Sequence, residues 1–331
     1  MKPANILVVD DEAQNLALMQ QILQSHYPLV FAKTGNAALA AVSKHKPALI
    51  LLDVQLPDID GYEVCRRLKA SDNTSHIPVI FVSSHADILH EAEGFAVGAA
   101  DYIVKPITPE IVKLRVANHL SLVRAASLER AYLDAIQMLG EAGHYNDTDT
   151  GEHIWRMAAY AQCLAEAAGL DQRSCELIQL AAPMHDTGKI GIPDQILRKP
   201  AKLDADEWQV MKTHTQIGYD ILSRSTAPVF QMAAEIALNH HEKWDGTGYP
   251  AGLKGADIPL SARIVAVADV YDALTMIRPY KAAWSSEQAF EHIVSERGKH
   301  FDPALIDCFI ELRAELEQIK TDFGLEATMH G

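Results

Sequence analysis

Five short apolar runs alternate with helix-type segments over residues 1–106, and this alternation limits the fold more than any other feature. Between the runs, segments such as NLALMQQILQ and GYEVCRRLK place apolar residues at helical spacing. Strand, helix and strand in repeated order predict a parallel sheet with helices on both faces. The predicted strands are NILVV (5–9), PLVFA (28–32), ALILLD (48–53), PVIFVS (78–83) and DYIVK (101–105).

After residue 106 the alternation of strand-type and helix-type segments gives way to a mainly helical pattern. No proline occurs between Glu110 and Ala182. Apolar residues recur there at helical spacing at Leu128, Tyr132, Ala135 and Leu139. We therefore predict a helix that continues out of the first domain, a boundary near residues 125–140, and a mainly helical second domain. An ordinary last helix followed by a short linker is the alternative, and the sequence does not decide between them.

Composition and charge exclude several classes of protein. Residues 131–331 hold 17 Lys and Arg against 30 Asp and Glu, whereas residues 1–130 hold 12 against 14. The net charge of −13 in the second part argues against DNA binding, and an anionic substrate needs cations there. Four scattered cysteines and no signal-peptide pattern predict a cytoplasmic protein with reduced thiols. No apolar run reaches the about 20 residues of a membrane helix.

Polar residues stand at the carboxyl ends of four of the predicted strands. They are Asp10 and Asp11 after the first, Asp53 in the third, Ser83 in the fourth and Lys105 in the fifth. The carboxyl ends of parallel strands converge on one crevice, where three carboxylates repel unless a divalent cation or a lysine compensates. Asp53 would be the central carboxylate and could attack a phosphoryl group, with Mg²⁺ and Lys105 neutralising the oxygens.

With these residues in place, the first part of the chain resembles a response-regulator receiver domain, which we assign to residues 1–122. The resemblance implies a flavodoxin-like α/β fold with a five-stranded parallel sheet, and phosphorylation of Asp53 by a sensor histidine kinase. Asp10 and Asp11 match the Mg²⁺-binding acids. Ser83 and Tyr102 match the switch residues, and the bond between Lys105 and the proline after it is commonly cis in this family.

A second set of polar residues has the types expected of metal ligands. Its members are Asp149, His153, His185, Asp186, His214, His240, His241 and Asp269. Asp149 and His153 are four residues apart and so share a helix face. Asp186 and Asp269 follow apolar runs, where a metal explains a buried carboxylate. Imidazole and carboxylate without thiolate favour Fe, Mn, Ni, Zn or Co, and the number of ligands predicts a binuclear centre bridged by a carboxylate such as Asp186. A single histidine in isolation is more often an ordinary core or surface residue.

Two segments, HDTGKIGIPD (185–194) and HHEKWDGTGYP (240–250), resemble the signatures of the HD-GYP domain, a subgroup of the HD phosphohydrolase superfamily. The resemblance implies an all-α metallohydrolase that hydrolyses the bacterial messenger cyclic di-GMP to pGpG, to GMP or to both. We assign this domain to residues 141–331, after a helical linker at 123–140. One metal would be held by His153, His185, Asp186 and Asp269. The second would be held by Asp186, His214, His240 and His241.

The resemblance also implies a mechanism. Two metals would lower the pKa of a bridging water, and Lys189 would help them to stabilise charge on the phosphate oxygens. Arg278 and Lys281 match positions that bind the phosphates of the ligand. Asp149 stands where many family members have glutamate. Its shorter side chain favours two metals over three and leaves open whether pGpG is the better substrate.

Alternatives from other classes remain. The domain could keep its metals and act mainly as a signalling module that contacts partners such as diguanylate cyclases through Gly246–Pro250. Another HD-type hydrolase or a di-iron oxygenase is disfavoured by the length of the WDGTGYP match. The complete ligand set and Lys189 favour the enzyme. The native metal, the direction of regulation, the cognate kinase and the presence of a homodimer stay open.

Overall fold

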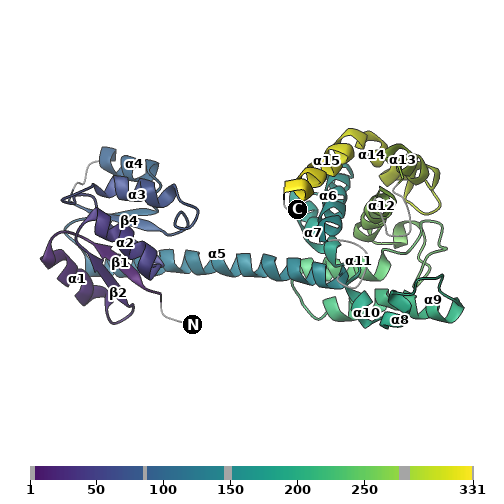
Figure 1. The fold of residues 1–331 in the computed structure, drawn as a ribbon, viewed down its shortest axis with the longest axis horizontal. Coiled ribbons are helices and arrows are strands. Elements are labelled where there is room, and N and C mark those ends of the chain that lie inside the picture. The colour runs from purple at the N-terminus through teal and green to yellow at the C-terminus, as the bar shows by residue number, and fades with distance from the viewer. Residues whose placement is uncertain (1–3, 85–87, 145–150, 276–283, 330–331) are drawn as a thin grey trace. The chain divides into compact units, whose positions relative to one another are not determined.

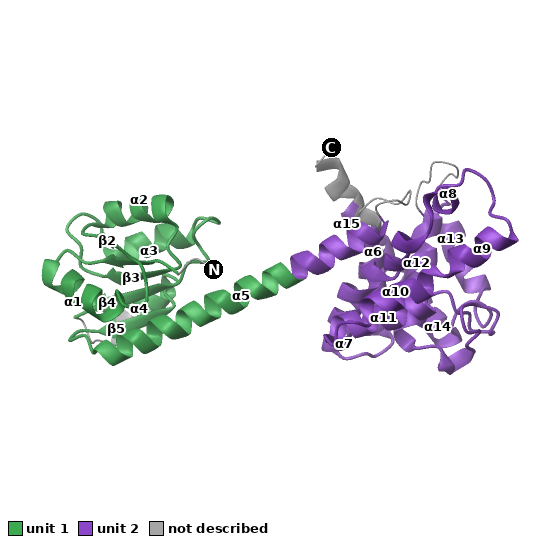
Figure 2. Cartoon of the chain, turned by 90° about the horizontal axis from the view of Figure 1, so that it is seen from below, with its two compact units in different colours: residues 1–132 green, residues 133–331 purple. Residues whose placement is uncertain are grey.

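The computed structural model describes residues 4–84, 88–144, 151–275 and 284–329 (Figure 1). The chain divides into two compact units, Met1–Tyr132 and Leu133–Gly331 (Figure 2). The division falls within the stretch 125–140 in which the sequence places the domain boundary. In the described ranges, no helix is both long enough and apolar enough to cross a membrane.

The first unit contains the predicted parallel sheet. Its strands are β1 (Ile6–Val9), β2 (Leu29–Ala32), β3 (Leu49–Asp53), β4 (Val79–Ser83) and β5 (Asp101–Val104). All pairs are parallel and the spatial order is β2-β1-β3-β4-β5, with Ile6 of β1 opposite both Leu29 and Leu49. The prediction of five strands in an α/β fold is confirmed.

The helices of this unit cover both faces of the sheet. They are α1 (Ala13–Leu23), α2 (Gly35–His45), α3 (Gly61–Lys69) and α4 (Ile88–Ala96). Alternate strand residues enter separate cores, because successive side chains of a strand point to opposite faces. Leu7 and Ile50 pack with Val42 of α2 and Leu68 of α3. Residues of the other register, such as Val8, lie in the core that includes α1.

The helix α5 (Pro109–His144) is the element common to both units. Near its start, Val112 and Val116 are fully buried in the core of the first unit. Towards its end, Ile136 is fully buried in the core of the second unit. The linker that the sequence places at 123–140 therefore lies inside one helix.

The regular secondary structure in the described residues of the second unit is helical, apart from one isolated bridge between Arg297 and Phe301. Its α-helices are α6 (Gly151–Ala167), α7 (Gln172–Ala181), α8 (Asp194–Leu197), α9 (Ala205–Lys212), α10 (His214–Leu222), α11 (Pro228–Asn239), α12 (Leu260–Thr275), α13 (Ser286–Ser295), α14 (Pro303–Glu311) and α15 (Arg313–Met329). Three 3₁₀ turns are η1 (Ala182–Met184), η2 (Thr187–Gly191) and η3 (Gly255–Asp257). The all-helical prediction is confirmed.

The ends of helical segments position His185 and Asp186 in the second unit. The side chain of Asp171 caps α7 by accepting a hydrogen bond from the backbone N–H of Ser174. At the other end of α7, Pro183 lies at the start of η1, where its ring is compatible with a new first turn. The chain between η1 and η2 contains only His185 and Asp186. This break in the helix turns both side chains into the interior.

Candidate functional site

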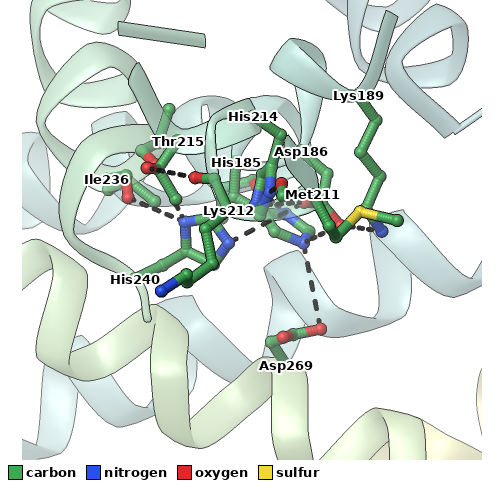
Figure 3. Close-up of polar contacts among 12 residues, drawn as sticks. His185, Asp186, Lys189, Met211, Lys212, His214, Thr215, Ile236, His240 and Asp269 are labelled. Carbon is green, nitrogen blue, oxygen red and sulfur yellow. Dashed lines mark hydrogen bonds and ion pairs between the residues drawn. The ribbon is translucent and has the colours of Figure 1, made fainter. Parts of the chain in front are cut away.

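The carboxylate of Asp186 lies at the centre of a cluster of histidines (Figure 3). Its Oδ2 atom is 3.2 Å from His185 Nε2 and 2.7 Å from Lys189 Nζ. Its Oδ1 atom is 3.4 Å from His214 Nε2 and 3.8 Å from His240 Nε2. The two oxygens thus face different imidazoles, which is the arrangement that a bridging carboxylate requires.

Each of these three imidazoles is oriented by a backbone carbonyl of its own helical turn. The pairs from Nδ1 to carbonyl oxygen are His185–Ala182 (2.9 Å), His214–Met211 (2.7 Å) and His240–Ile236 (3.1 Å). A carbonyl oxygen only accepts hydrogen bonds, so Nδ1 carries a proton in each ring and Nε2 is the nitrogen that faces Asp186. This orientation of the ring is common among metal-binding histidines.

The buried atoms that point into the cluster fit a cation. Within the described part of the chain, the Nε2 atoms of the three imidazoles and Oδ1 of Asp186 have no hydrogen-bond partner. Such groups are costly to bury unless something satisfies them. One ligand atom from each of Asp186, His214, His240 and His241 lies within 4.8 Å of the others. A divalent cation would satisfy these atoms, and the nitrogen and oxygen donors suit Fe, Mn, Ni or Zn.

Burial and charge set the protonation of the cluster. Burial lowers the pKa of His214, lowers that of His240 well below its usual value, and lowers that of His241 to about 3. Burial also acts to lower the pKa of His185, but Asp186 and Asp269 outweigh it and raise this pKa to about 9. Three of the four imidazoles are therefore neutral, which is the form that binds metals.

Asp186 stays ionised despite its burial. Burial acts to raise the pKa of this carboxyl, but Lys189 and the imidazoles of His185 and His214 outweigh it, and the pKa lies well below the ordinary value. The carboxylate can therefore offer both oxygens as ligands at neutral pH.

Close packing of η2 on α10 brings Asp186 to His214. A Cβ atom added at Gly188 would lie 1.8 Å from the carbonyl oxygen of His214 and 2.5 Å from the backbone nitrogen of Gly218. Only glycine allows the two backbones to approach so closely. This contact accounts for the glycine in the HDTGK segment.

The loop that follows the paired histidines is held by Glu242, which the sequence analysis did not single out. This side chain is 2% exposed, and its carboxylate accepts hydrogen bonds from the backbone N–H groups of Ala251, Gly252 and Leu253 at 2.7–3.0 Å. In the same loop, the ring of Tyr249 stacks on His241 with centroids 4.7 Å apart. The glycine-rich segment therefore folds back over a ligand candidate.

Other predicted residues are only partly described. Asp269 of α12 places Oδ1 3.8 Å from His185 Nε2, on the Oδ2 side of Asp186. His153 belongs to α6, but its side chain lies outside the description. Asp149, Arg278 and Lys281 lie outside the described residues.

One histidine that the sequence analysis did not consider lies beside the cluster. His144, the last residue of α5, is 3% exposed and its ring centroid is 5.1 Å from that of His185. No local motif marks this residue, so its proximity could not be read from the sequence.

The first unit brings together the acids at its strand ends. Lys105 Nζ lies 2.9 Å from Asp10 Oδ2 and 2.7 Å from Asp53 Oδ2. Carboxylate oxygens of Asp10, Asp11 and Asp53 lie within 4.8 Å of one another. Burial raises the pKa of Asp53, although Lys105 acts in the opposite direction. The group has the oxygen ligands that Mg²⁺ prefers.

The other predicted receiver residues occupy neighbouring positions. Ser83 is buried at the carboxyl end of β4. Tyr102 of β5 is 5% exposed and its ring lies 6.4 Å from that of Phe81. The peptide bond between Lys105 and Pro106 is cis, as predicted.

Comparisons with known proteins agree with this architecture. The model of the response regulator receiver domain matches residues 6–117, and that of the HD domain matches residues 116–305. The chain belongs to the response regulators that carry an HD domain. Both family resemblances are confirmed at this level.

Three relatives are informative. The chain is 38% identical to the cyclic di-GMP phosphodiesterase response regulator RpfG of Xanthomonas campestris, over 99% of this chain and 92% of that protein. It is 35% identical to a cyclic di-GMP phosphodiesterase of Thermotoga maritima, over 98% of this chain and 94% of that protein. It is 46% identical to 3'3'-cGAMP-specific phosphodiesterase 2 of Vibrio cholerae, over 54% of this chain and 34% of that protein.

Proposed function

We propose that this protein is a phosphorylation-regulated, metal-dependent phosphodiesterase that hydrolyses cyclic di-GMP. The observation that carries the proposal is the carboxylate of Asp186, whose Oδ1 faces His214 and His240 while its Oδ2 faces His185 and Lys189. Two relatives that are named cyclic di-GMP phosphodiesterases align with almost the whole chain, which supports the choice of substrate.

The proposed metal centre would hold two divalent cations, and Asp186 would contribute a ligand oxygen to each set of residues. His185 and Asp269 would hold one cation together with His153, and His214, His240 and His241 would hold the other. Bound cations of this kind lower the pKa of a coordinated water and polarise phosphate oxygens. The receiver would hold Mg²⁺ through Asp10, Asp11 and Asp53.

The residues of this chain have separate tasks in the reaction. The hydrogen bonds from Nδ1 to backbone carbonyls fix the imidazoles so that Nε2 would be available to a bound cation. Lys189 carries a positive charge beside Asp186, where it would offset charge that develops on the phosphate. Arg278 and Lys281 are proposed to bind the phosphates of the substrate.

Hydrolysis proceeds one phosphodiester at a time. One water adds to phosphorus and the bond to the 3′ oxygen breaks, which converts cyclic di-GMP to linear pGpG. A second water cleaves pGpG to two molecules of GMP. The same cluster could catalyse both steps, because each replaces a phosphodiester by a phosphate monoester and a hydroxyl group.

Product chromatography on the full chain, supplied with Mn²⁺, tests the activity. Cyclic di-GMP, 3'3'-cGAMP and pGpG would be offered separately, because one relative is named for 3'3'-cGAMP. We expect Asp186→Asn to reduce turnover by at least about 100-fold, since it removes a charge that both cations share. His292→Gln, outside the cluster, is the matched control. A manganese-loaded protein that cleaves none of the three would refute the proposal and favour the interaction module.

The receiver is proposed to control this activity through Asp53, which would accept a phosphoryl group from a histidine kinase. Turnover would be measured with and without beryllofluoride and Mg²⁺, which imitate the phosphorylated receiver. We expect a change in rate that is absent from Asp53→Asn. Identical rates in the unmodified protein would refute the coupling and leave the hydrolase proposal untouched.

A further inference from the structure

We propose that His144 is a further metal-binding residue of the centre, on the side of Asp186 that faces His185. The inference rests on the metal centre of the proposed function. It adds a ligand that comes from the end of α5, outside the two segments that resemble the HD-GYP signatures.

The geometry places a ligand atom of His144 beside two others. A ring nitrogen of His144, a ring nitrogen of His185 and a carboxylate oxygen of Asp186 all lie within 4.8 Å of one another. The two rings are 5.1 Å apart and inclined by 52°. His144 is 3% exposed and His185 is 1% exposed, so the group lies in the interior. Imidazole is a common ligand of transition-metal cations, and a cation within this triangle would reach all three residues.

The packing of α5 explains how His144 arrives there. Ile136, Gly140, Gly143 and His144 follow helical spacing and so share one face of the helix. A Cβ atom added at Gly140 would lie 3.0 Å from the Cβ of Pro183. A Cβ atom added at Gly143 would lie 2.9 Å from the Cα of Thr187. The two glycines therefore allow the last turns of α5 to lie directly against residues 183–187. His144 follows on the same face, beside His185 and Asp186.

The ligands on each side of Asp186 are compatible with the assignment. On the Oδ1 side, His214, His240 and His241 complete a set of four with Asp186. On the Oδ2 side, the described side chains are those of His185 and Asp269, with Lys189 as a cation. His144 would join Asp186, His185 and Asp269 here, and with the His153 of the proposed function this side would offer five nitrogen and oxygen donors, a number that an expanded zinc site or an octahedral cation accepts.

His144 belongs to α5, the helix that begins in the first unit and ends in the second. Val112 and Val116 of the same α5 are buried in the core of the first unit. A change at the end of α5 would therefore alter the coordination of a cation as well as the packing around it.

Cobalt binding by the full chain tests the proposal without use of enzymatic activity. The metal-free protein would be titrated with Co²⁺ while the visible absorption is recorded, and the cobalt kept after dialysis against a chelator would be counted by mass spectrometry. The variants are His144→Gln and His144→Leu. Asp186→Asn is the reference for a lost ligand, and His292→Gln is the control histidine.

If His144 is a ligand, both of its variants should bind cobalt at least about 10-fold more weakly and change the visible spectrum, because the metal loses a nitrogen donor. His292→Gln should behave as the unmodified protein. Unchanged spectra and affinities in both His144 variants, alongside loss of cobalt in Asp186→Asn, would overturn the proposal.

A second measurement needs no variant and so does not depend on how the variants fold. Anomalous diffraction from cobalt-loaded crystals of the unmodified protein would locate the ions. A cobalt ion bonded to a ring nitrogen of His144 supports the proposal, and a His144 ring bonded to no cobalt overturns it. If His144 binds cobalt in a protein that cleaves no cyclic dinucleotide, the proposed function fails and this inference stands.

Discussion

The replacement Glu242→Gln tests whether one buried carboxylate holds the loop over the metal centre. Glu242 Oε1 accepts the backbone N–H groups of Ala251 and Gly252, and Oε2 accepts that of Leu253. Glutamine keeps one oxygen for the first pair but turns an NH₂ group towards Leu253. The variant thus changes two charged hydrogen bonds into neutral ones and loses the third.

The expected cost follows from those three bonds. A hydrogen bond to a charged group contributes about 1.5–3 kcal/mol, and a neutral one about 0.5–1.5 kcal/mol. Because these amides are only partly buried, we take the lower values and expect local opening to become easier by about 3.5 kcal/mol. This corresponds to amide exchange that is roughly 300-fold faster, at about 1.4 kcal/mol for each factor of ten.

Hydrogen–deuterium exchange followed by mass spectrometry would measure this effect on peptides that cover residues 243–258. We expect faster exchange there and little change in the helices of the first unit. Glu235→Gln is the matched control, since Glu235 is exposed on α11 and accepts the hydroxyl of Ser261. Exchange in Glu242→Gln that equals the control would refute the role of the carboxylate.

Three further predictions concern packing and metal binding. Gly188→Ala should abolish metal retention measured by mass spectrometry, because its Cβ would lie 1.8 Å from the carbonyl oxygen of His214 and force η2 away from α10. Arg156→Met should destabilise the helical unit by about 3–5 kcal/mol, seen as a lower melting temperature, since it leaves buried Asp272 without its two-bond partner. Mn²⁺ at about 100 times its dissociation constant should stabilise the metal-free protein by about 2.7 kcal/mol in thermal unfolding.

Each of these has a matched control. Gly191→Ala adds a Cβ that meets the side chain of Ile217 rather than backbone, so it should keep the metals. Arg297→Met removes an exposed pair with Asp307 of the same two-bond geometry, and should leave the melting temperature unchanged. Asp186→Asn should lose most of the stabilisation by Mn²⁺. Equal behaviour of variant and control would contradict the corresponding prediction.

The strands of the first unit could be predicted because their signal is local. Every residue of β1 and β3 is buried and, apart from Asp53 at the end of β3, all of them are apolar, so each strand reads as an apolar run. The acids at the strand ends were predictable for a related reason, since a parallel topology brings those ends to one edge. Asp10 and Asp53 meet at Lys105, although 52 residues separate Asp53 from Lys105.

The types of the metal-ligand candidates in the second unit could be predicted from the sequence, but the residues that support them could not. His185, Asp186 and His240 stand in recognisable segments, and the structure brings their side chains together with that of His214. The role of Glu242 could not be predicted, because its partners are backbone N–H groups whose direction depends on the fold of the loop. A hydrogen bond to a backbone N–H group places little constraint on the type of the residue that donates it, so the sequence does not reveal it.

The sequence by itself determined the parallel sheet, the helical second unit and the chemistry available for metal binding, because periodicity and side-chain type are properties of short segments. The tertiary structure decided which oxygen of Asp186 faces which imidazole, and it placed His144 beside His185. That placement depends on Gly140 and Gly143 of α5 lying against residues 183–187, some 40 positions later in the chain. Such a contact requires the two surfaces to fit, and their fit is set only when the whole domain packs.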